Sequence, residues 1–119
     1  MATIIDETQV ESRMVTEDGA IGLQYKTLFG PLPGRRLNSN LVIVEPGGLT
    51  RAHRHQWEQV NYILAGKGVL KTGDGSVRPV AAGTAVHISG GEMHWFENTG
   101  SEPMKLLGVL GPMPPEDKR

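Results

Sequence analysis

Histidines are the residues of this chain best able to bind a metal ion or to move a proton near neutral pH. There are four of them, His53, His55, His87 and His94. His53 and His55 lie in a stretch, 50–55, that we expect to be a strand, where residues two apart share a face. Two imidazoles on one face can reach a single point, as a metal ion requires. An isolated His-x-His pair is more often incidental, so the residues around it must decide.

Glycines and polar residues stand at fixed distances around these histidines. From Gly47 to Gly66 the chain reads GGLTRAHRHQWEQVNYILAG, and from Gly83 to Asn98 it reads GTAVHISGGEMHWFEN. The two stretches resemble the two motifs of the cupin family, written G(x)5HxH(x)3–4E(x)6G and G(x)5PxG(x)2H(x)3N. Eight of the ten signature positions match in register. The chain therefore resembles a small single-domain bacterial cupin.

Two positions depart from the family pattern. Ser89 replaces the proline of the second motif, which loosens a turn, and Gln59 replaces the glutamate ligand of the first. Glu58 is the alternative ligand, but its offset of three from His55 puts it on the opposite face of a regular strand. Gln59, four residues after His55, lies on the same face of such a strand as the histidines. A bulge would reverse this preference.

The resemblance implies a divalent metal ion inside a conical barrel, held by His53, His55, Gln59 and His94. Three neutral imidazoles and a neutral amide leave a 2+ ion its full charge, which favours an anionic substrate and polarises a bound carbonyl. A glutamate ligand would lower that charge by one, so the replacement favours Lewis-acid over redox chemistry. Because imidazole suits several metals, Zn, Ni, Mn and Fe all remain candidates.

Two polar residues are candidates for contact with a substrate. Arg51 shares strand parity with His53 and His55, so it is either a residue of the cavity mouth that pairs with a carboxylate or a solvated loop arginine. Asn61 shares parity with Gln59. A polar side chain facing a barrel interior is costly unless it is hydrogen-bonded, so Asn61 serves either the substrate or the ligands.

The remaining candidates carry weaker signals. For His87 we favour a packed or surface histidine over a role in proton transfer, and for Tyr62 and Tyr25 core residues over an acid or base facing the metal. Phe96 shares parity with His94 and is expected in the pocket wall. Trp57 is expected in the pocket wall or rim, or on a dimer surface.

Short strands between turns must position these residues. The 16 glycines and 8 prolines are spread through the chain and exclude long helices. Residues 21–29 alternate with period two, and Gly73-Asp74-Gly75 before 77–80 predicts a hairpin. We also expect a strand within 8–17 and a break at 46–48. Nine or ten strands predict an all-β barrel or sandwich, and the resemblance specifies the cupin double-stranded β-helix, or jelly-roll, barrel.

The length and charge of the chain limit the number of domains and the kinds of partner that it can have. With 119 residues it fits one domain, in which we expect N-terminal strands over 1–30, a barrel over 31–112 and a polar tail over 113–119. Its 12 basic and 13 acidic residues give a net charge of −1, which argues against nucleic acids and anionic membranes as partners. It has no cysteine, no apolar run of about 20 residues and no expected export signal, so we expect a cytoplasmic protein.

Fold and motifs together predict a metal-binding protein that acts on a small molecule. We favour an enzyme that uses the metal as a Lewis acid on a small anionic or polyhydroxylated carbonyl or enol substrate, of the isomerase, cyclase or lyase type. Small cupins with a His, His, Gln, His set resemble uronate-ketonising cupins and aromatic polyketide cyclases, both of which stabilise an enolate-like intermediate. The alternatives are a dioxygenase using Fe(II), Ni or Mn, a non-enzymatic small-molecule-binding cupin, and a vestigial metal site. The resemblance also implies a homodimer, whose contacts we expect in the N-terminal strands.

Overall fold

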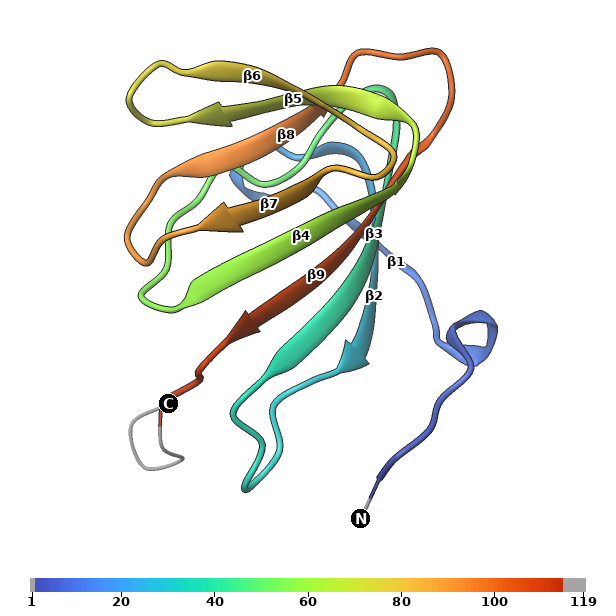
Figure 1. Ribbon diagram of the computed structural model, residues 1–119. Helices are drawn as coiled ribbons and strands as arrows, with labels where there is room; N and C mark the ends of the chain where they lie inside the picture. Colours follow the sequence, from blue (N-terminus) through green and yellow to red (C-terminus); the bar gives the residue numbers. More distant parts are fainter. Residues whose placement is uncertain (1, 115–119) are drawn as a thin grey trace.

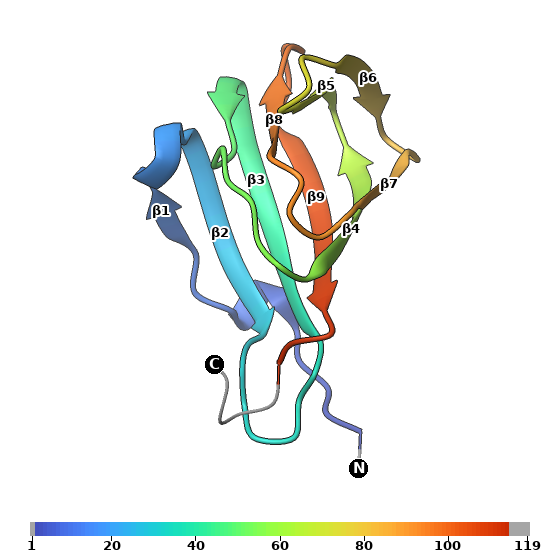
Figure 2. The same ribbon diagram turned by 90° about the vertical axis from the view of Figure 1, so that its left-hand side faces the viewer.

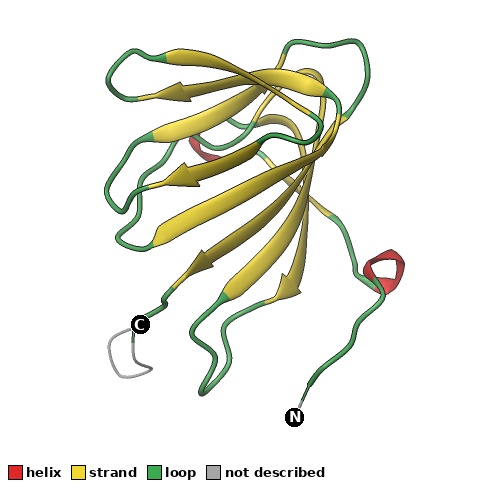
Figure 3. Ribbon diagram, viewed as in Figure 1, coloured by secondary structure: helices red, strands yellow, loops and turns green. Residues whose placement is uncertain are grey.

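Strands make up most of the molecule. The computed structural model describes residues 2–114, in which the only helices are two 3-10 turns, η1 (Glu7–Gln9) and η2 (Glu17–Gly19). The strands are β1 (Arg13–Val15), β2 (Ile21–Phe29), β3 (Asn38–Leu49), β4 (Glu58–Ala65), β5 (Lys67–Thr72), β6 (Val77–Ala81), β7 (Ala85–Ile88), β8 (His94–Asn98) and β9 (Met104–Gly111). Figure 3 shows the strands, in yellow, joined by loops and turns, in green. The all-β prediction is confirmed. The described part contains no helix with the length and apolarity that crossing a membrane would demand.

The strands form one curled antiparallel sheet. Their order is β6-β5-β8-β3-β9-β4-β7, with β2 added beside β3 and β1 beside β2. Both views show the sheet curving around a common interior, with β5, β6 and β8 facing the long strands β3, β9 and β4 (Figures 1 and 2). The junction between these two halves is narrow, since β3 meets β8 only at Leu49 and Glu97. This is the predicted jelly-roll architecture.

The core fills the interior between the two halves. Alternation along the strands turns every second side chain inward, as in β9, where Met104 and Leu106 are buried and the residues between them are partly exposed. Ile63 of β4 and Val44 of β3 pack in the same cluster. Each such buried side chain stabilises the fold by about 1.5–3 kcal/mol relative to an exposed one. This apolar packing holds the strands that carry the polar residues described below.

Three expected strand boundaries are wrong. β3 continues through 46–48, because Gly47 takes a positive φ of 79° and lets a bulged strand stay paired as far as Leu49. Residues 50–55 form an extended loop in which only His53 makes a bridge, to His94. Within 8–17 only Arg13–Val15 is a strand. The residues before it do not extend the strand, because the chain turns at η1, which Asp6 caps. The hairpin over 67–81 is confirmed.

The expected boundaries between the N-terminal segment, the barrel and the tail differ from the observed ones. β2, within the expected N-terminal segment 1–30, pairs with β3 along its length and forms barrel wall. Met113, where the tail was expected to begin, is buried, and its backbone N–H donates to the carbonyl of Arg36 at 2.6 Å. Residues 115–119 of that tail lie outside the described residues.

Candidate metal centre

Three of the four histidines come together at one end of the barrel. His53 and His55 lie on the loop between β3 and β4, and His94 begins β8. One ring nitrogen from each lies within 4.8 Å of the others. Backbone hydrogen bonds in both directions between His53 and His94, at 3.1 and 3.4 Å, tie the loop to the strand. The three side chains are therefore held by backbone pairing and could hold a metal ion.

The hydrogen bonds of these histidines fix their ring orientation. Each Nδ1 lies 2.7–3.0 Å from a main-chain carbonyl oxygen two residues away. A carbonyl oxygen can only accept, so each Nδ1 must donate, which leaves every Nε2 with a free lone pair. A second hydrogen bond of this kind accompanies most metal-bound histidines. The Nε2 of His94 is buried and has no hydrogen-bond partner within the described residues, which a metal ion would explain.

Gln59 directs its oxygen at the same place. Its Nε2 donates to Asn61 Oδ1 at 2.6 Å, and Asn61 Nδ2 in turn donates to the carbonyl of Leu107 at 3.4 Å. This leaves Gln59 Oε1 facing His55 Nε2 at 2.9 Å. When the His55 ring is neutral, both of these atoms present lone pairs, so they repel unless a cation lies between them. The donor set thus fits a metal ion.

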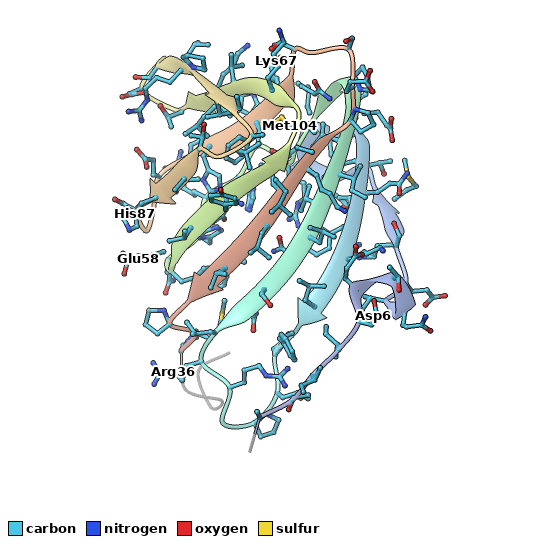
Figure 4. The ribbon with its side chains drawn as sticks, turned by 45° about the vertical axis from the view of Figure 1, so that its right-hand side comes forward. Asp6, Arg36, Glu58, Lys67, His87 and Met104 are labelled. Atoms are coloured by element: carbon cyan, nitrogen blue, oxygen red, sulfur yellow. The ribbon has the colours of Figure 1, made fainter. Side chains whose placement is uncertain are left out.

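Glu58, the alternative to Gln59, points the other way. Its carboxylate accepts a hydrogen bond from His87 Nε2 at 2.7 Å, and both side chains are exposed. Figure 4 shows the two projecting together from the outer edge of the barrel. Strand alternation explains the placement, because Gln59 and Asn61 face inward and their neighbours on β4 face out. Tyr62 is also exposed on that outer face. The structure does not bring His87 or Tyr62 to the histidines.

Burial keeps His53 and His94 neutral. Loss of water lowers the pKa of His53 and of His94 below the usual 6.5, and the hydrogen bonds to the carbonyls of Arg51 and Glu92 offset this only in part. Imidazole must be neutral to bind a metal, so both are ready to do so at neutral pH without first losing a proton.

A cavity of about 90 Å³ adjoins the histidines, and a wider mouth of about 430 Å³ lies outside it. Arg51 lines both, and its guanidinium is held by Asp18 at 3.1 and 3.2 Å. Asn61, only 4% exposed, and Phe96 line the inner cavity. Trp57 lines the mouth, where its ring stacks on His55 at a centroid distance of 5.3 Å.

Among the polar residues of the inner cavity, Asn40 was not predicted from the sequence, and Tyr25 was expected in the core. Tyr25 of β2 and Asn40 of β3 line the cavity, and Asn40 Nδ2 donates to Tyr25 Oη at 2.8 Å. A signal was available for Asn40, because it occupies the same alternation phase of its strand as Val42 and Val44, which are buried. A polar residue in an apolar phase marks either a satisfied core group or a binding site.

Comparisons with known proteins agree with this geometry. The cupin domain family matches residues 40–110. Auxin-binding protein 1 of Arabidopsis thaliana is 29% identical over 106 residues, which cover 81% of this chain, and the chain spans 54% of that relative's length. The polyketide cyclase RemF from Streptomyces resistomycificus is 30% identical in sequence, with a TM-score of 0.82. The match covers 93% of this chain and 80% of the RemF chain. A predicted oxalate decarboxylase from Thermotoga maritima, 21% identical over 93% of this chain and 100% of its own, has the same fold at a TM-score of 0.81.

Proposed function

Since the chain belongs to the cupin domain family, we propose that it is an enzyme that uses a divalent metal ion, without redox change, to polarise a carbonyl or enol oxygen of a small anionic or polyhydroxylated substrate. The reaction would be an isomerisation, cyclisation or elimination. The single observation that carries the proposal is the convergence of lone pairs from His53, His55, His94 and Gln59, one of them buried without a partner.

The chemistry of this donor set favours a Lewis acid. All four side chains are neutral, so a bound 2+ ion would keep its charge and supply electrostatic stabilisation of a developing enolate oxygen. Asn61 is the positioning residue of the set, because its hydrogen bond orients the Gln59 amide with its oxygen toward the histidines.

The other residues of the cavity bind and shield the substrate. The Arg51 guanidinium, steadied by Asp18 at the mouth, is placed to orient an anionic group. Leu23, Phe96 and Leu106 line the inner cavity with apolar surface. By excluding water they strengthen each electrostatic interaction with the reacting oxygen.

The relatives support two readings of the site. RemF, which is 30% identical, is named a polyketide cyclase, and this favours a carbonyl substrate. The likeness to a protein named for binding auxin favours a second candidate, a domain that binds a small molecule without transforming it.

The first experiment measures bound metal in protein purified without a histidine tag or chelators. We expect one equivalent of Zn, Ni or Mn per chain in the wild type, loss of the metal in His94→Ala, and retention in His87→Ala, a matched control on the outer face. One equivalent of iron, with activity that requires oxygen, would point instead to a dioxygenase. No metal after reconstitution would overturn the proposal.

The second experiment separates catalysis from binding. Metal-loaded protein is incubated under nitrogen in D2O with pyruvate or acetoacetate, and NMR follows exchange of the protons next to the carbonyl. Exchange above that of chelator-treated protein and of His94→Ala supports the enzyme. Binding of these anions without exchange supports the binding domain.

A further inference from the structure

Tyr25 holds a hydrogen-bond donor that nothing in the fold uses. Its Oη accepts from Asn40 Nδ2 at 2.8 Å, so the phenol proton is left to donate elsewhere. Within residues 2–114 that proton finds no acceptor, although the side chain lines both the inner cavity and its mouth. A donor in this position is available to a bound molecule.

A glycine on the neighbouring strand leaves room for the Asn40 amide. Asn40, Gly108 and Asn61 lie side by side on β3, β9 and β4, in register. A Cβ on Gly108 would lie 2.5 Å from Asn40 Oδ1 and 3.2 Å from Asn61 Nδ2, so only glycine leaves room for both amides. With its oxygen toward Gly108, Asn40 presents its Nδ2 to Tyr25. The phenol oxygen is thereby engaged as an acceptor.

The phenol stays protonated in this environment. Burial raises the pKa of Tyr25 above its usual 10, and the hydrogen bond from Asn40 opposes this only in part. The Arg13 guanidinium lies over the ring, 5.3 Å from its centroid, and helps to hold it in place. Tyr25 is therefore a donor at neutral pH and not a base.

We infer that Tyr25 binds a second oxygen of the substrate, while the first oxygen lies at the three histidines. The substrate class is then a flat, conjugated molecule with two oxygens on one edge. The inference rests on the proposed function, since it takes the first oxygen to be held at the metal site. Donation from Tyr25 would stabilise negative charge that conjugation spreads from the first oxygen to the second.

The shape of the site agrees with that class. The inner cavity, at about 90 Å³, takes little more than the oxygen-bearing edge, and Val42, Phe96 and Leu110 make its walls apolar. The rest of the molecule would lie in the mouth, which Pro31 and the Trp57 ring that stacks on His55 both line. A flat unsaturated body suits these surfaces better than a polyhydroxylated chain.

The test is selectivity in binding, measured by calorimetry on the zinc-reconstituted full chain. The probes are acetophenone, which has a single carbonyl oxygen, and 3-hydroxyacetophenone, whose hydroxyl adds a second oxygen too far from the first to chelate the same ion. We expect the wild type to bind 3-hydroxyacetophenone about 2- to 12-fold more tightly than acetophenone, the value of one hydrogen bond. Tyr25→Phe should abolish this preference and leave the Kd of acetophenone unchanged.

Two further variants sharpen the result. Asn40→Asp supplies a carboxylate that accepts the phenol proton, so the preference should disappear although Tyr25 is present. Tyr62→Phe removes the hydroxyl of the other tyrosine, exposed on the outer face, and should leave the preference intact. Zinc content is measured in every sample.

The outcomes separate the two proposals. Zinc-loaded wild type without a preference, or a preference that survives in Tyr25→Phe, overturns the inference and leaves the metal-dependent function standing. Wild type that takes up no zinc overturns the proposed function. A preference lost in Tyr25→Phe and Asn40→Asp but kept in Tyr62→Phe supports the inference.

Discussion

At the scale of single residues, two adjacent side chains of β4 point to opposite faces of the strand. Gln59 faces the histidines with its amide oxygen, whereas Glu58, one residue earlier, accepts a hydrogen bond from His87 on the exposed outer face. Alternation of side chains along β4 separates the carboxylate from the site by direction and not by distance along the chain. The charge of the centre therefore depends on which of the two positions carries the acid.

Gln59→Glu should bind the metal more tightly than the wild type. The new carboxylate faces His55 and attracts the ion, and it also lowers the net charge of the centre by one, so the proton exchange proposed above should slow. Competition with a chelating dye measures the affinity. Glu58→Gln is the matched control on the outer face, and an equal change in both variants would contradict the assignment of Gln59.

Asn61→Leu should weaken metal binding by about 10- to 100-fold, the usual cost of removing the group that orients a ligand. Without the acceptor for its Nε2, the Gln59 amide is free to turn its nitrogen toward the histidines. The same dye competition measures the loss, and circular dichroism checks that the variant is folded. Unchanged affinity in a folded variant would show that Gln59 needs no such support.

At the scale of elements, local turns carry hydrogen bonds of their own. In the β5–β6 hairpin, Asp74 Oδ1 accepts from Thr72 Oγ1 at 2.6 Å and from the Ser76 N–H at 3.0 Å. These bonds, the Thr72 hydroxyl first, lower the pKa of Asp74 from 3.8 to about 2. Because the ionised form is favoured in the folded state, its stabilisation is present above pH 4 and is lost as the pH falls toward 2.

Asp74→Asn should therefore be less stable than the wild type at pH 7. The difference in melting temperature should shrink as the pH falls below about 4, where the carboxylate of the unfolded chain takes up a proton, and should be lost near pH 2, where the folded chain does so too. Thermal unfolding at stepped pH measures this, and NMR of the Asp74 carboxyl carbon gives the midpoint. A midpoint close to 3.8 would mean that the turn does not favour the charge.

At the scale of the whole molecule, an apolar strip remains on the outside of the barrel. Val60, Tyr62 and Leu64 of β4 are 46%, 43% and 44% exposed. The β9 residues paired with the first two, Val109 and Leu107, are partly exposed and extend the strip. Contiguous exposed apolar surface of this kind is typical of an interface, and a second copy of the chain would cover it.

We therefore expect a homodimer in solution, and Leu64→Lys should dissociate it. Light scattering after gel filtration measures the mass. Met14→Lys on β1, 60% exposed and within the N-terminal segment where the sequence placed the contact, is the comparison. Dissociation by Met14→Lys alone would move the interface to the N-terminal strands, and a monomeric wild type would exclude the dimer.

The amino-acid sequence by itself determined the fold class and the group of three histidines. Spaced glycines and strand alternation are local properties, and the two motifs tie His53, His55 and His94 to fixed offsets from turns. The parity argument for Gln59 over Glu58 counted from His55 along one strand, whereas His55 lies in a loop; the two side chains point apart because they alternate along β4, which begins at Glu58.

Only the tertiary structure decided which distant residues complete the cavity. Asn40 and Asn61 meet across Gly108 because β9 lies between β3 and β4, an order that no local pattern encodes. Tyr25 reaches the same cavity through the pairing of β2 with β3, and residues 50–55 are a loop because His53 pairs with β8 instead of a neighbouring long strand. Local periodicity predicts the face of a side chain, whereas its partners depend on strand order and register, which the packing of the whole barrel selects.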